Sequence, residues 1–354
     1  MCIRDSVDAF RDSLYAMLKR NTFLNIKFEN MLDTLGEMSR TDLYSYLKEW
    51  EQLTPLPFYS IGEPELTKVV NKGGEEFFVL KVLVSNNSDY DGIIQMNVLQ
   101  NGWWYQPMED PRARKKVEIA AHTSKEFVSV WEEQIRDVEI NTMVSGNLPY
   151  MIRQSIGNVK QERNKIVKDT IYTLPESSLE MPGEVIVDNE DSTLFVLSTP
   201  AVVGLLPKWL DKVEDTSFKY SGISWWRAPL QWTATTNAKY YGKYIRSAYV
   251  IKSGDGSQTA TWKIPVPEAG QYELYYHVFK DDELRWNDRL QGEYHFRVAY
   301  DSEMEDAYIN LRKANEGWEQ LGTYYFSADT VRVVLTDECK LRSVTADAVK
   351  IVKR

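Results

Sequence analysis

The chain has 354 residues, a length typical of two or three domains. Its 42 Lys and Arg against 52 Asp and Glu give a net charge of −10, which argues against a nucleic-acid-binding protein because phosphate binding needs a basic surface. The 43% hydrophobic and 27% charged residues are those of an ordinary globular protein. Two cysteines, Cys2 and Cys339, are too few for a disulfide framework.

The first six residues, Met1-Cys-Ile-Arg-Asp-Ser6, resemble a translated transposase sequencing adapter. We interpret residues 1–6 as an artefact and expect the native chain to extend upstream. The absence of a signal peptide then carries no information about location. No stretch predicts a membrane span, because the most apolar one, 194–206, is shorter than the ~18 residues required and contains Pro200.

Residues 7–56 have the apolar spacing of helices. Apolar side chains recur every three or four positions in three stretches, which is the period of one helix face. These residues are Val7, Phe10, Leu14 and Leu18, then Phe28, Met31, Leu32 and Leu35, then Leu43, Tyr46, Leu47 and Trp50. Prolines at 55 and 57 end the pattern. We expect a short helical segment that is the remnant of an upstream domain.

Residues 57–156 alternate between apolar and polar side chains, which predicts strands. The alternating apolar residues include Phe78, Leu80, Val82 and Val84, Ile94, Met96 and Val98, Val117 and Ile119, and Val128 and Val130. Turn-forming residues at 86–92 separate the runs. The spacing predicts an Ig-like antiparallel sandwich, and the polar segment 157–182 is predicted to be a linker.

Residues 183–354 contain a second block of strand signals. The predicted strands are 184–187, 246–251, 259–264, 272–278, 294–299, 323–326, 331–335 and 348–352. Seven or eight strands of this kind fit a jelly-roll-like sandwich. The predicted fold class is therefore mainly β, with two antiparallel β-sandwich domains preceded by a short helical segment.

Several motifs in this second block occur in a characteristic order. They are Glu184-Val-Ile-Val-Asp-Asn-Glu-Asp191, Tyr241-Gly-Lys-Tyr-Ile-Arg-Ser-Ala248, Gly270-Gln-Tyr-Glu-Leu-Tyr275, Ala314-Asn-Glu-Gly-Trp318 and Ala346-Asp-Ala-Val349. Residues 183–353 thereby resemble the golvesin C-terminal or xanthan-lyase-associated domain. The resemblance implies a carbohydrate-binding-like β-sandwich module, attached to exported bacterial enzymes and without catalytic activity of its own.

Residues 7–150 have a weaker resemblance to the post-catalytic region of gluzincin-type aminopeptidases. It rests on Trp50-x-x-x-Thr54-x-Leu56-Pro57 and Val144-Ser-Gly-Asn-Leu-Pro149. The peptidase zinc motif H-E-x-x-H is absent from this sequence. The resemblance leaves open an alternative, in which the chain is the structural C-terminal part of a zinc metallopeptidase-like protein whose catalytic domain lies elsewhere.

An aromatic cluster is the best candidate for ligand binding, because an aromatic face can stack against the apolar face of a sugar ring. The candidate glycan-binding residues are Trp225, Trp226, Trp232, Tyr240, Tyr241, Tyr244 and Arg227. Adjacent residues of an extended segment point in opposite directions, so at most one of the first two tryptophans faces solvent. The alternative is that most of these rings belong to the core or anchor loops.

Acidic residues near both ends of the second block are candidates for a structural calcium ion, which prefers oxygen ligands. The candidate ligands are Asp188, Asp191 and Asp347. The alternative is a turn in which the carboxylates accept hydrogen bonds from backbone N–H groups. Apart from this calcium ion, the sequence predicts no cofactor.

No catalytic motif occurs in the sequence, so we expect a non-catalytic accessory fragment of a larger bacterial exported protein. The family resemblance implies a periplasmic, cell-surface or secreted location. The expected partners are a polysaccharide or cell-envelope glycan and an upstream domain of the same parent chain, with no nucleic acid and no membrane span.

Overall fold

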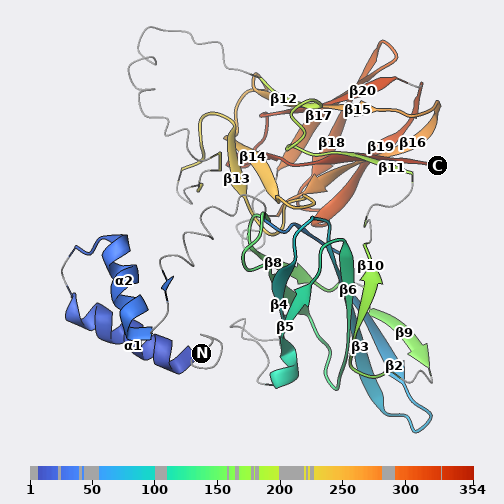
Figure 1. Cartoon of the computed structure of the whole chain (residues 1–354). Helices are drawn as coiled ribbons and strands as arrows, with labels where there is room; N and C mark the ends of the chain where they lie inside the picture. The colour runs from blue at the N-terminus through green and yellow to red at the C-terminus, as the bar shows by residue number, and fades with distance from the viewer. Residues whose placement is uncertain are drawn as a thin grey trace. The chain divides into compact units, whose positions relative to one another are not determined.

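The computed structural model (Figure 1) describes residues 7–22, 25–39, 42–43, 56–99, 110–157, 159–163, 167–176, 179, 183–198, 219–220, 222–223, 227–280, 292–327 and 329–354. The chain divides into two compact units, Met1–Leu56 and Pro57–Arg354. The predicted fold class is confirmed, because the described residues are mainly β, in antiparallel sheets that follow two short helices.

The first unit contains the helices α1 (Val7–Arg20) and α2 (Phe28–Ser39). Met17, Leu35 and Leu43 form its small buried core, and of these Leu35 and Leu43 belong to the predicted apolar stripes. The prediction is wrong for two other members of the apolar stripes, since Leu18 and Phe28 are exposed. The third predicted helix, around Trp50, lies outside the described residues. No helix in the described part of the chain is long and apolar enough to cross a membrane.

The second unit begins with a sandwich of two sheets, here called the first sandwich. In spatial order, sheet I contains β10 (Thr170–Pro175), β6 (Thr123–Trp131), β3 (Glu76–Asn86), β2 (Glu65–Val70) and β9 (Val159–Arg163), with β1 (Tyr59–Ile61) also paired to β3. Sheet II contains β5 (Arg114–Ile119), β4 (Gly92–Leu99), β7 (Asp137–Asn141) and β8 (Met151–Ser155), with the short 3-10 helix η2 (Pro111–Ala113) preceding β5.

The inward-facing residues of sheets I and II form one core. It includes Leu80 and Val82 of β3 and Ile94 and Met96 of β4, which are the residues whose alternation predicted these strands. The segment 157–182 was predicted to be a linker, but it contributes β9 and β10 to the two edges of sheet I. Both edge strands expose most of their side chains, and this exposure explains why their sequence is polar.

The second sandwich, residues 184–354, contains three sheets around one core. Sheet III contains β11 (Glu184–Val187), β22 (Val349–Lys353), β16 (Gly270–Val278) and β19 (Gly317–Phe326). Sheet IV contains β12 (Phe195–Leu197), β15 (Thr259–Pro265), β20 (Thr330–Thr336), β17 (Glu293–Tyr300) and β18 (Glu303–Asn310). Sheet V contains β13 (Thr233–Thr236), β14 (Ser247–Lys252) and β21 (Ser343–Ala346).

The core of the second sandwich follows from strict alternation in β15, β16 and β17. In β16, Leu274, Tyr276 and Val278 are buried, whereas Tyr275 and His277 between them face outward. The register across sheet III then sets the outward-facing residues of neighbouring strands side by side. This outer face of sheet III carries the site described below.

The alternation makes a direct stability prediction. Leu274→Ala should lower the free energy of unfolding by about 2–5 kcal/mol, because Leu274 is fully buried and truncation leaves a cavity. Tyr325→Ala is the control, since Tyr325 is 65% exposed and should change stability by about 0.5 kcal/mol or less. Urea denaturation followed by tryptophan fluorescence measures both values. Equal losses in the two variants would contradict the assigned strand faces.

Candidate functional site

A buried carboxylate, Asp347, lies at the centre of the candidate site, in the short turn between β21 and β22. Its side chain has no exposed surface, and Oδ2 is 2.8 Å from Nδ1 of His277 in β16. Both carboxylate oxygens also accept from the backbone N–H of Tyr241, at 3.2 Å each. Burial raises the pKa of Asp347, while His277, the Tyr241 N–H and the charge of Arg246 oppose that rise.

Three aromatic rings pack against one another beside the residues that bond to this carboxylate. His277 and Trp318 are register partners on β16 and β19, and their rings meet edge to face with centroids 5.1 Å apart. The ring of Tyr241 lies 5.0 Å from Trp318 and 5.8 Å from His277. Asp347 therefore holds the ring of His277 directly, and it holds the backbone from which the ring of Tyr241 projects.

A lysine, Lys350 of β22, extends this group of rings across sheet III. Its ammonium nitrogen lies 4.9 Å from the ring centroid of Trp318 and 5.4 Å from that of Tyr275. The same nitrogen forms a 2.8 Å ion pair with Glu184 of β11, and both side chains are nearly buried. Lys350 is therefore held between two rings, with its charge already compensated by Glu184.

We call the resulting surface the ring row. It consists of Tyr241, His277, Trp318 and Tyr275 on the outer face of sheet III. All four are half-buried, so each keeps some surface open to solvent. Polar groups border the row, since Glu273 accepts from the Tyr275 hydroxyl at 2.6 Å and exposed Gln320 lies opposite Tyr275 in the register. The row thus combines flat apolar faces with hydrogen-bonding groups.

The segment 241–246 connects the ring row to the first sandwich. Gly242 has a φ of +150°, and a Cβ there would lie 1.9 Å from the carbonyl oxygen of Ile245, so the turn requires glycine. Leu148 of the first sandwich donates its N–H to the carbonyl of Tyr244 at 3.0 Å and accepts from the N–H of Arg246 at 2.7 Å. These two hydrogen bonds anchor the segment that carries Tyr241 to the first sandwich.

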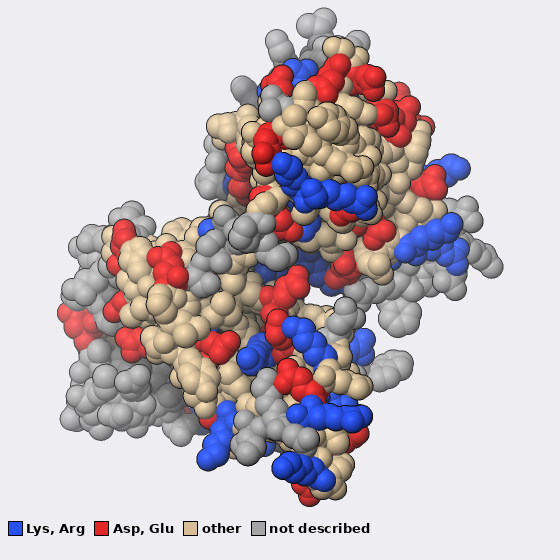
Figure 2. All heavy atoms as spheres, turned by 90° about the vertical axis from the view of Figure 1, so that its right-hand side faces the viewer, with Lys and Arg blue, Asp and Glu red and all other residues tan. Residues whose placement is uncertain are grey.

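Figure 2 shows the side of the molecule that lies at the right in Figure 1. Lys and Arg are interspersed with Asp and Glu on this face rather than gathered into a stripe of one sign.

Of the residues predicted to bind a glycan, only Tyr241 belongs to the ring row. Tyr240 is buried, with its ring edge to face against Phe279 at 4.7 Å. The ring of Tyr244 lies 5.3 Å from Phe58 of the first sandwich. The packing of these two tyrosines agrees with the alternative interpretation, in which such rings are core or anchor residues.

The other predicted glycan-binding residues lie away from the ring row or outside the described residues. Trp232 packs against the core, and its indole nitrogen is buried without a hydrogen-bond partner in the described part of the chain. Arg227 is exposed in an extended stretch before β13. Trp225 and Trp226 lie outside the described residues.

Three residues of the ring row were not in the predicted set. Tyr275 and His277 lie on the predicted strand 272–278, whereas Trp318 lies upstream of the predicted strand 323–326, in the part of β19 that the sequence did not predict. The alternation in 272–278 assigns positions 275 and 277 to the outer face, and the register then places Trp318 beside His277. That register cannot be obtained from the sequence alone, because β16 and β19 are separated by 38 residues that include other strands.

The predicted calcium ligands lie in two different settings. Asp191 accepts from both the N–H and the hydroxyl of Thr193, as in the turn alternative. Burial and the nearby charge of Asp347 raise the pKa of Asp188 well above its usual range. Among the residues that the structure describes, no group of three or more His, Cys, Asp or Glu side chains could hold a metal ion. The calcium ion stays a prediction.

Comparison with known families finds one match, which covers part of the second sandwich. Residues 225–353 match the golvesin C-terminal domain. The golvesin C-terminal domain is an accessory, non-catalytic type of domain. In the structure the golvesin-type sandwich also includes β11, which pairs with β22 and lies upstream of the matched residues. A search of curated proteins gives no match, and the aminopeptidase resemblance receives no support.

Solved structures show only distant likeness. One is a GH26-CBM35 β-(1,4)-mannanase of Podospora anserina, 11% identical over 49% of this chain and 28% of that chain, with a TM-score of 0.25. Another is a β-glucuronidase of Bacteroides uniformis, 11% identical over 90% of this chain and 32% of that chain, with a TM-score of 0.23. Scores this low do not establish a shared fold. The chain spans less than a third of each of these proteins.

The central position of Asp347 can be tested by truncation. Asp347→Ala should lower the free energy of unfolding by about 3–5 kcal/mol, because it leaves the N–H groups of His277 and Tyr241 without their acceptor. Asp191→Ala is the matched control and should cost about 1 kcal/mol, since it removes only a local turn contact. Chemical denaturation measures both, and a loss for Asp347→Ala no larger than the control would contradict the assignment.

Proposed function

We propose that the golvesin-type sandwich binds a polysaccharide through the ring row, as an accessory part of an exported bacterial protein. The observation that carries the proposal is the arrangement of Trp318, which is held against the rings of Tyr241 and His277 and over the ammonium of Lys350. An aromatic ring fixed in this way loses little side-chain entropy when it packs against a sugar ring. The accessory nature of the family supports the same role.

The polar groups beside the rings suit the hydroxyls of a sugar. Nδ1 of His277 faces the buried carboxylate of Asp347, so Nε2 lies on the opposite edge of the ring, away from that carboxylate. In the neutral imidazole, Nε2 is then a hydrogen-bond acceptor for a sugar hydroxyl. Gln320 and Glu273 add further polar groups on the same face. The fixed pairing of Lys350 with Glu184 favours a neutral sugar over an anionic one.

The location follows from the same proposal. Golvesin-type domains are typically extracellular, and an extracellular polysaccharide or cell-envelope glycan is the ligand class within reach of such a domain. We infer a periplasmic, cell-surface or secreted protein, in which the sandwich positions an upstream domain of the parent chain on its glycan.

The proposal predicts the effect of removing one ring. Trp318→Ala should weaken binding to a neutral polysaccharide at least tenfold, which is about 1.4 kcal/mol, because the main stacking face is lost. Affinity electrophoresis against a panel of neutral and uronate-containing polysaccharides measures the retardation of each variant. Trp318→Phe should keep part of the binding, since a smaller ring still stacks.

A matched control separates this surface from other exposed rings. Tyr308 on β18 is 58% exposed on the outer face of sheet IV, so Tyr308→Ala should leave binding unchanged. Thermal unfolding should confirm that Trp318→Ala remains folded. The proposal is wrong if folded wild-type protein is retarded by no polysaccharide of the panel, or if Tyr308→Ala abolishes retardation while Trp318→Ala does not.

A further inference from the structure

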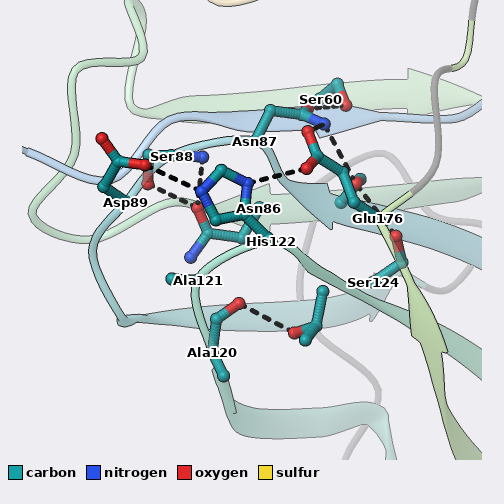
Figure 3. Close-up of polar contacts among 12 residues, drawn as sticks. Ser60, Asn86, Asn87, Ser88, Asp89, Ala120, Ala121, His122, Ser124 and Glu176 are labelled. Carbon is teal, nitrogen blue, oxygen red and sulfur yellow. Dashed lines mark hydrogen bonds and ion pairs between the residues drawn. The ribbon is translucent and has the colours of Figure 1, made fainter.

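Three segments of the first sandwich meet at His122, as Figure 3 shows. His122 lies in the turn between β5 and β6, Asp89 in the turn between β3 and β4, and Glu176 directly after β10. Nδ1 of His122 is 2.7 Å from Oε2 of Glu176, and Nε2 is 2.8 Å from Oδ1 of Asp89. Each nitrogen of one imidazole therefore faces a different carboxylate.

A protonated histidine fits this geometry better than a neutral one. An ionised carboxylate can only accept hydrogen bonds, and a neutral imidazole has one donor nitrogen and one acceptor nitrogen. Neutral His122 would therefore direct a lone pair at either Glu176 or Asp89. The imidazolium form donates from both nitrogens and satisfies both contacts.

The partners of His122 are themselves held in place. The second oxygen of Glu176 accepts from the side-chain amide of Asn87 at 2.8 Å, and Ser60 of β1 donates to the amide oxygen of Asn87. On the other side, Asp91 accepts from the backbone N–H of Ala121, which fixes the turn that carries His122. The three segments are thus tied to one another at one end of the sandwich.

The charges around this group favour the ion pairs. Hydrogen bonds to Glu176 and Asp89 raise the pKa of His122, with a small opposing effect of desolvation. Hydrogen bonds from Asn87 and His122 lower the pKa of Glu176, and the positive charge of Lys243, from the connection between β13 and β14, acts in the same direction. Besides these groups, Asp91 lies in the turn that carries Asp89.

We propose that His122, Glu176 and Asp89 form a proton-operated clamp that holds the end of strand β10 in the first sandwich. β10 is an edge strand that, among the described strands, pairs with β6 alone, and its side chains are largely exposed, so few other described contacts hold it. The clamp acts at the point where the chain leaves β10 toward the second sandwich. Deprotonation of His122 opens it.

The pH range over which the clamp is closed follows from the raised pKa of His122 and the lowered pKa of Glu176. The raised pKa of His122 gives a stabilisation that is complete below about pH 6.5 and is lost as the pH rises through that raised value. The lowered pKa of Glu176 gives a stabilisation that is lost as the pH falls through that lowered value. The clamp is therefore closed under mildly acidic conditions and opens as the pH rises through the raised pKa of His122.

NMR titration of the histidine rings tests the ionisation directly. The chain has only three histidines, so each signal can be assigned with a His→Gln variant. His122 should titrate above pH 6.5, and both Glu176→Gln and Asp89→Asn should move its midpoint downward. Glu75→Gln is the control, because Glu75 lies in the turn between β2 and β3 and bonds to Asn71 instead. A midpoint at or below 6.5, or one that Glu176→Gln leaves unchanged, overturns the proposal.

Amide hydrogen exchange tests the mechanical consequence. Between about pH 5.5 and about pH 8.5, after correction for the intrinsic pH dependence of exchange, wild-type β10 should lose protection several-fold. His122→Gln should show the weaker protection at both pH values, while the central strand β20 of the second sandwich stays unchanged as an internal reference. If β10 in His122→Gln keeps the wild-type pH dependence, no clamp exists.

Discussion

The candidate site depends on one buried carboxylate that must be satisfied. A carboxylate with no solvent contact is costly unless hydrogen bonds compensate it, and Asp347 obtains these from the ring of His277 and the backbone of Tyr241. Both donors belong to the same surface, so the hydrogen bonds that satisfy the carboxylate also orient the ring of His277 and fix the backbone of Tyr241. Trp318 packs against the rings of both residues. The site is pre-organised because the buried carboxylate needs the hydrogen bonds that these residues donate.

The same arrangement links the site to the first sandwich. The segment 241–246 contains Tyr241, which belongs to the ring row. It also contains Tyr244 and Arg246, whose backbones form hydrogen bonds with Leu148. The side chain of Arg246 donates to the carbonyl of Ala238, and its charge also acts on Asp347. The two sandwiches therefore share a structural element beside the proposed glycan surface. We infer that the first sandwich supports the position of that surface.

The sequence predicts most of the fold and little of the site. Alternation identified β3, β4 and β16 because one face of each strand is buried, and it missed β18 because its exposed acidic residues hide the pattern. It likewise missed the edge strands β9 and β10, whose polar sequence was predicted to be a linker. The ring row was missed for another reason, since it depends on the register that joins β16, β19 and β22. The clustering of aromatic residues in sequence selected Tyr240 and Trp232, which the structure assigns to packing.

The most direct test of the account is NMR titration of isotope-labelled protein with a neutral polysaccharide that it binds. Binding at the ring row should shift the indole signal of Trp318 and the backbone amides of Tyr241 and His277, and leave the indole of the fully buried Trp262 in place. Shifts confined to other surfaces, such as the outer face of sheet IV around Tyr308, would contradict the assignment of the site to the rings that Asp347 organises.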